Sequence, residues 1–147
     1  MNKTIIAVHG RASEGKSSTI KEVFRQIIED FPHTRVDRKV NFKGDILVII
    51  TINNIKIGIE SQGDPNSRMI NEDTLRKLTE EKCQIILCAT RTSGKTVKKV
   101  DTIANEFNYH TIWLSSYWSP SLNHNVLNKK AAANIIELIK SLMINQI

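Results

Sequence analysis

Apolar residues along the chain form short unbroken runs that alternate with longer stretches of helical periodicity. The runs at 4–9, 45–52 and 84–90 have the length and β-branched content of buried strands, and 55–61 and 111–115 show a similar pattern. Between these runs, apolar residues three and four positions apart predict amphipathic helices. The residues that mark the helices are Ile20, Val23, Phe24, Ile27 and Ile28; Leu75 and Leu78; Val97, Val100, Ile103, Ala104 and Phe107; and, in a last helix expected to begin near Asn128, Ala131, Ile135, Leu138, Ile139 and Leu142.

The order of these elements is β-α-ββ-α-β-α-β-α. Asn53 and Asn54 separate the two adjacent strands and predict a tight antiparallel hairpin, because asparagine tolerates a positive φ. Alternating strands and helices are typical of an α/β fold with helices on both faces of a mainly parallel sheet. We therefore predict a three-layer α/β/α architecture, with the hairpin supplying one antiparallel edge strand, in a single domain covering residues 1–147.

Composition narrows the class of protein further. The chain has 147 residues, of which 40% are apolar and 24% charged, and these values exclude a disordered or collagen-like protein. Cys83 and Cys88 flank one predicted strand at a distance of roughly 16 Å, too far apart to form a disulfide with each other. No apolar run approaches the ~20 residues of a membrane span, and the N-terminal run is shorter than a secretory signal. We expect a cytoplasmic protein without membrane contact.

The residues 10–17, with the sequence GRASEGKS, fit the pattern G-x-x-x-x-G-K-[ST]. A predicted buried strand precedes them and a predicted amphipathic helix follows, which is the context that this phosphate-binding motif requires. Glycines allow successive backbone N–H groups to surround phosphate oxygens, and the start of the helix adds its positive end. Lys16 is then expected to contact the β- and γ-phosphates and the Ser17 hydroxyl to coordinate Mg²⁺. A glycine-rich turn that simply caps a helix is the alternative.

The motif and the order of elements resemble the P-loop NTPase superfamily, and the layout is similar to that of the small GTPases. The resemblance implies binding of a nucleoside triphosphate with Mg²⁺, with Lys16 as a catalytic residue. It assigns nucleotide contacts in the loop to Gly10, Arg11, Ala12, Ser13, Glu14, Gly15, Lys16, Ser17 and Ser18. The net charge of +6 suits an anionic ligand of this kind, although it also suits simple solubility.

The family's second motif, D-x-x-G, has a near match in the residues 60–63, ESQG. The resemblance implies that Glu60 contacts the Mg²⁺ and its water, and that the Gly63 N–H contacts the γ-phosphate. Asp64 follows where small GTPases often have a water-orienting glutamine, so Glu60 and Asp64 are further candidate catalytic residues. The alternative is a polar loop that leaves a strand.

The guanine-reading motif N/T-K-x-D is expected after the strand at 84–90, where the chain instead has TRTS at 90–93. Because the lysine and the aspartate are both missing, we expect ATP rather than GTP. Arg91 on one side and Tyr117 with Trp118 on the other are predicted to stack on the adenine. Two alternatives stay open: the aromatic pair covers the core, or Arg91 contacts phosphates or a second anionic substrate.

A basic cluster, Arg35, Arg38, Lys39 and Lys43, lies in the predicted connection before the hairpin, where small GTPases have a switch loop. We interpret it as a solvated face, and the absence of a basic strand studded with aromatic residues argues against nucleic-acid binding.

The function expected from the whole pattern is Mg²⁺-dependent binding and hydrolysis of ATP. The alternatives are a kinase that transfers the γ-phosphoryl group and a binding module that a nucleotide switches toward a protein partner. The sequence leaves the oligomeric state open.

Overall fold

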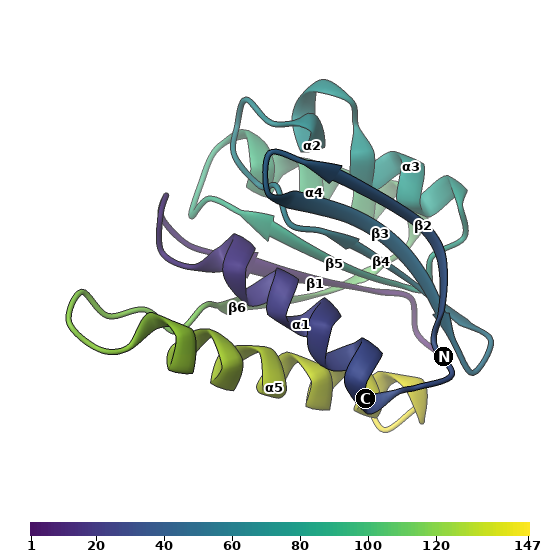
Figure 1. Cartoon of the computed structure of the whole chain (residues 1–147). Helices are drawn as coiled ribbons and strands as arrows, with labels where there is room; N and C mark the ends of the chain where they lie inside the picture. The colour runs from purple at the N-terminus through teal and green to yellow at the C-terminus, as the bar shows by residue number, and fades with distance from the viewer.

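A computed structural model describes the protein over residues 1–147. It contains six strands and five helices in an α/β arrangement (Figure 1). In chain order they are β1 (Thr4–His9), α1 (Lys16–Asp30), β2 (Arg35–Phe42), β3 (Asp45–Ile52), β4 (Ile55–Glu60), α2 (Arg68–Asn71), α3 (Thr74–Glu80), β5 (Ile85–Thr90), α4 (Lys95–Phe107), β6 (His110–Ser115) and α5 (His124–Met143).

The strands form one sheet in the order β2-β3-β4-β5-β1-β6. The four strands β4, β5, β1 and β6 pair in parallel, as the alternation of strands and helices predicted. The predicted hairpin is present as β3 and β4, and both residues of its turn, Asn53 and Asn54, have positive φ values of 49° and 66°. The sheet is therefore mostly parallel, with antiparallel pairing confined to one end.

The edge of the sheet at that end differs from the prediction. Residues 35–42, expected to be a connection, form the additional strand β2, which pairs antiparallel with β3 and is itself the edge. The strand escaped the sequence analysis because all eight of its residues are exposed, so it lacks the apolar run by which a buried strand is recognised. Three residues of the basic cluster, Arg35, Arg38 and Lys39, thus lie in a strand rather than in a connection, and Lys43 follows in the turn.

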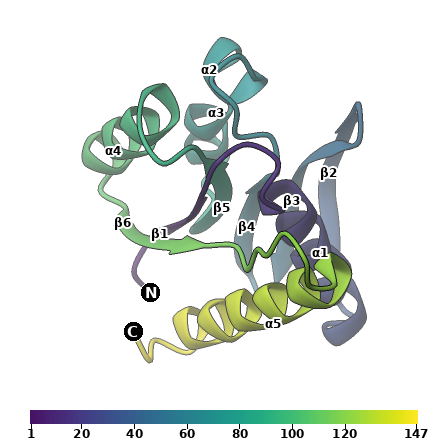
Figure 2. The ribbon, with the colours of Figure 1, turned by 90° about the vertical axis from the view of Figure 1, so that its left-hand side faces the viewer.

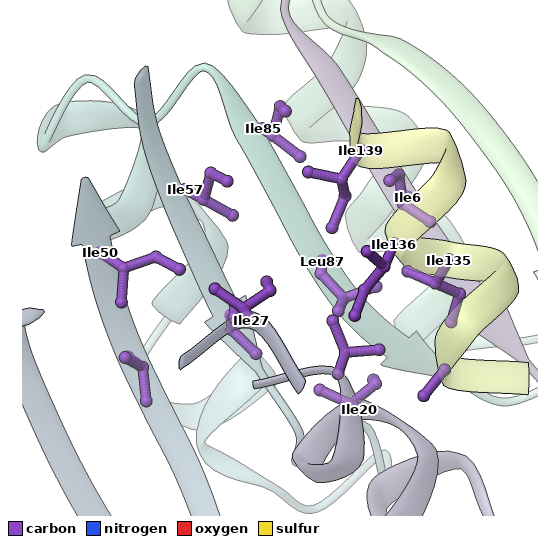
Figure 3. Close-up of a cluster of buried hydrophobic side chains, with 14 of the residues drawn as sticks. Ile6, Ile20, Ile27, Ile50, Ile57, Ile85, Leu87, Ile135, Ile136 and Ile139 are labelled. Carbon is purple, nitrogen blue, oxygen red and sulfur yellow. The ribbon is translucent and has the colours of Figure 1, made fainter. Parts of the chain in front are cut away.

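Helices cover both faces of the sheet (Figure 2). On one face, α1 and α5 pack with the sheet around a large aliphatic cluster that includes Ile20, Ile27 and Ile136, all at most 2% exposed (Figure 3). On the other face, α2, α3 and α4 bury a second cluster that includes Met69, Leu78 and Val100. These buried positions have the spacing expected of amphipathic helices.

Two helix boundaries differ from the prediction. The polar stretch after β4 forms two short helices, α2 and α3, rather than one. The last helix begins at His124, four residues before the predicted start near Asn128, because the Asn123 side chain accepts a hydrogen bond from the Val126 N–H at 3.1 Å and caps it there. No helix has both the length and the apolarity needed to cross a membrane.

The sheet topology brings several chain segments to one edge. Parallel register places His9 opposite both Thr90 and Ser115, so β1, β5 and β6 end side by side. Because β3 runs antiparallel to β4, it begins at the edge where β4 ends. The residues that follow parallel strands therefore meet Asp45, the first residue of β3, at this edge.

Substitutions of Ile20 and Ile28 provide a test of how α1 packs. Ile20→Ala is expected to lower the free energy of unfolding by about 2–5 kcal/mol, because the fully buried side chain leaves a cavity in the aliphatic cluster. Ile28, which is 40% exposed on the same helix, is the matched control. Ile28→Ala should change the free energy of unfolding by less than about 0.5 kcal/mol. Urea unfolding of both variants measures the difference, and equal losses would contradict the packing of α1.

Candidate functional site

The loop between β1 and α1 has the backbone shape expected of an anion-binding loop. Ser13 and Gly15 have positive φ values of 61° and 80°, which turn the chain sharply before the helix begins. Gly15 is the N-cap of α1, and no side chain caps the first turn of the helix. The N–H groups of this turn therefore have no side-chain acceptor, and the positive end of the helix favours an anion here.

The Lys16 side chain lies buried between the ends of two strands. Its ammonium group donates hydrogen bonds to the carbonyl oxygens of Gly10 at 2.7 Å and Thr90 at 2.8 Å. Burial lowers the pKa of Lys16, and the positive charge of Arg91 lowers it further. No carboxylate pairs with Lys16 directly, so its charge is free to attract an anionic group.

An aspartate that the sequence analysis did not consider lies next to Ser17. The Ser17 hydroxyl donates to Asp45 Oδ1 at 2.5 Å, and the Ser61 hydroxyl donates to the same oxygen at 2.8 Å. Ser61 is held in turn because its oxygen accepts a hydrogen bond from the Ile46 N–H at 2.8 Å. The result is a cluster of two hydroxyls and one carboxylate beside the first turn of α1.

The side chain of Glu60, the predicted metal ligand, does not lie beside Ser17 and Asp45. It is fully buried, and both oxygens bind the Arg68 guanidinium, Oε2 to Nε at 3.0 Å and Oε1 to Nη2 at 2.9 Å. Oε1 also accepts a hydrogen bond from the Gln62 N–H at 3.0 Å. Asp45, rather than Glu60, is thus the carboxylate beside Ser17, because Arg68 of α2 holds Glu60 inside the protein.

The loop after β4 lies tightly against the end of β5. A Cβ atom on Gly63 would lie 2.2 Å from the Ala89 carbonyl oxygen, so no larger residue fits at this position without moving the chain. Next to it, Asp64 Oδ1 accepts a hydrogen bond from Arg91 Nε at 3.0 Å. Asp64 and Arg91, which the sequence analysis gave separate roles, therefore form an ion pair at the rim of the site.

A cavity of about 380 Å³ lies over the loop. Ten of the predicted site residues line it: Ser13, Glu14, Gly15, Lys16, Ser17, Ser18, Gly63, Asp64, Tyr117 and Trp118. Five do not, namely Gly10, Arg11, Ala12, Glu60 and Arg91. The residues that the sequence analysis missed are Asp45, Ser61, Gln62, Ala89, His124, Asn125 and Asn128. His124 and Asn125 lie in the first turn of α5, ahead of the predicted helix start near Asn128, and Asn128 lies one turn further along the helix.

Two aromatic side chains form part of the cavity wall. Tyr117 and Trp118 are 42% and 44% exposed and belong to neither hydrophobic cluster, which argues against the alternative that they cover the core. Trp118 stacks on the His124 ring with centroids 6.3 Å apart, and Ser116 joins this segment to the loop between β1 and α1 by donating to the Glu14 carbonyl at 2.7 Å. Arg91, the predicted counterpart of the aromatic pair, does not line the cavity and donates a hydrogen bond to Asp64.

No protein-family model matches the chain, and no curated protein or solved structure is similar to it. The function must therefore be inferred from the residues of the site.

The buried pair of Glu60 and Arg68 yields a prediction about stability. Arg68→Ala is expected to lower the free energy of unfolding by about 3–5 kcal/mol, since it leaves a buried carboxylate without its cationic partner. The control is Arg25→Ala, which removes exposed ion pairs on α1 and should leave stability nearly unchanged. Urea unfolding of both variants at pH 7 gives the comparison, and a small loss for Arg68→Ala would contradict the assigned role of the pair.

Proposed function

We propose that the protein is a P-loop NTPase that binds ATP with Mg²⁺ and hydrolyses it in the cytoplasm. The observation that carries this proposal is the loop at 10–17, in which Lys16 and the uncapped start of α1 line one cavity at the edge where the parallel strands end. In open α/β sheets, ligands bind at this edge. The triphosphate would lie along the loop, with its oxygens on the backbone N–H groups.

Lys16 can exchange its present partners for phosphate oxygens. The carbonyl groups of Gly10 and Thr90 are neutral acceptors, and an anion would attract the buried ammonium group more strongly than they do. In the hydrolysis reaction, negative charge develops on the γ-phosphate as water attacks it. Lys16 and the loop N–H groups would stabilise that charge without having to reorganise.

The residues around Ser17 fit a magnesium ion. Mg²⁺ prefers oxygen ligands and retains several waters, and the site offers the Ser17 hydroxyl with the Asp45 carboxylate beside it. No group of three or more His, Cys, Asp or Glu side chains is arranged to hold a metal, so the ion would depend on the phosphate oxygens for its remaining ligands. Bound there, Mg²⁺ would neutralise part of the negative charge of the phosphates.

The rest of the cavity lining provides groups for the attacking water and for the adenine of ATP. Asp64, exposed at the rim, has a carboxylate that can accept a proton from water, and Arg91 holds it in place. Tyr117 and Trp118 offer aromatic faces for a purine, and stacking needs no guanine-specific carboxylate. ATP turnover without any acceptor distinguishes hydrolysis from the kinase alternative, and binding without turnover would favour the nucleotide-switched module.

The decisive variant is Lys16→Ala. We expect ATP affinity in the presence of Mg²⁺ to fall at least ten-fold, roughly 1.4 kcal/mol, with the melting temperature little changed, since the hydrogen bonds of the ammonium group go to two neutral carbonyl oxygens and to no carboxylate. Lys95→Ala removes an exposed lysine at the start of α4 and serves as the control. Titration calorimetry on both folded variants measures the affinities. Unchanged binding and turnover in Lys16→Ala would exclude the proposed phosphate site.

A second pair of variants separates the two acidic residues. Asp45→Asn is expected to raise at least ten-fold the Mg²⁺ concentration that gives half-maximal hydrolysis, because it weakens the carboxylate beside Ser17. Glu60→Gln should destabilise the protein while leaving that Mg²⁺ concentration unchanged, since its carboxylate binds Arg68. Mg²⁺ titrations at fixed ATP give the result. If only Glu60→Gln shifted the requirement, the D-x-x-G resemblance would be the better guide to the metal.

A further inference from the structure

The edge strand β2 presents an unpaired backbone to the surroundings. It pairs with β3 on one side only, and every one of its eight residues is exposed. Strands at a sheet edge carry N–H and C=O groups that can pair with another extended chain. An irregular register between Val36 and Arg38 interrupts the strand near its start, so the regular edge runs from Arg38 to Phe42.

The regular part of this edge and the turn that follows it are positively charged. Arg38, Lys39 and Lys43 take part in no ion pair with the protein's own carboxylates; Lys39 lies over the Phe24 ring and Lys43 over the Phe42 ring. The acid on the strand, Asp37, is already engaged by Arg35 and the Thr51 hydroxyl. An added strand would therefore meet unpaired cations, and acidic side chains would complement them.

One face of β2 also provides apolar contacts. Val40 and Phe42 are 38% and 48% exposed, and they line a groove of about 220 Å³ between β2 and β3 on one side and α2 and α3 on the other. Leu47, Ile49 and Leu78 complete its apolar lining. The polar residues of the groove are Arg38, Arg68, Glu72, Thr74, Lys77 and Glu81. Apolar side chains of an added strand could pack on Val40 and Phe42.

We propose that β2 binds an acidic, extended segment of a partner protein, which adds to the sheet as a further strand. Its carboxylates pair with Arg38, Lys39 and Lys43, and its apolar residues contact Val40 and Phe42. Backbone pairing gives such complexes affinity, while alternate side chains give specificity. A second copy of this chain would bring the same cations against one another, and a nucleic acid has no backbone that pairs with a strand edge. The proposal does not depend on nucleotide binding.

The test uses the full-length protein and a displayed library of random twelve-residue peptides. Selected peptides are expected to alternate acidic and apolar residues. The double variant Arg38→Glu/Lys39→Glu should weaken a selected peptide at least ten-fold. The double variant Lys129→Glu/Lys130→Glu alters two exposed lysines of α5 and lowers net charge by the same amount, so it should bind normally. Hydrogen exchange should show new protection in β2 when the peptide is bound.

Several outcomes would overturn the proposal. They are no enrichment of peptides, enrichment without acidic residues, equal loss of binding in both double variants, or binding without protection of β2. Protection of β2 that rises with protein concentration in the absence of peptide would assign the edge to a second copy. Tighter binding of a single-stranded RNA oligonucleotide, lost in the β2 variant alone, would assign it to nucleic acid.

Discussion

The parallel pairing of β1 with β5 is the constraint on which the site depends. It places the ends of both strands side by side, and the two carbonyl groups there, from Gly10 and Thr90, hold the Lys16 ammonium group in a buried position. A lysine buried without a carboxylate partner is costly unless its hydrogen bonds are made. The loop therefore keeps its cation inside the protein, at the point where the uncapped start of α1 also favours an anion.

The carboxylates of Glu60 and Asp45 have different partners. Glu60 lies in the interior, where Arg68 satisfies both its oxygens and ties α2 to the end of β4. Asp45 lies at the cavity with hydrogen bonds from two hydroxyl groups and no cation paired with it. A carboxylate that already binds a guanidinium is poorly placed to bind Mg²⁺ as well, whereas one held by hydroxyl groups retains its charge for a ligand. This difference is why the proposed metal site moves from the strand end at 60 to the strand start at 45.

The antiparallel part of the sheet serves both proposals. It turns the chain so that β3 begins at the same edge where the parallel strands end, which brings Asp45 to Ser17. It also leaves β2 as an exposed, basic edge on the far side of the hairpin. The turn between β2 and β3 is held by Lys21 of α1, whose ammonium group donates to the Gly44 carbonyl at 2.9 Å. The proposed nucleotide site and the proposed docking strand thus include segments that are neighbours in the chain but present different chemistry.

The sequence by itself determined those features that depend on local pattern. Apolar runs identified five of the six strands, period-3.6 spacing identified the helices α1, α3, α4 and α5, and asparagines at 53 and 54 identified the hairpin. The motif at 10–17 could be found in the sequence because its two glycines, lysine and serine occur at a fixed spacing within eight residues. Tertiary structure alone decided the strand order, the existence of β2, the pairing of Arg68 with Glu60 and the approach of Asp45 to Ser17. The strand order and the two side-chain contacts depend on residues that are separated along the chain, and the residues of β2 are all exposed. Neither property produces a regular pattern of apolar residues in the sequence.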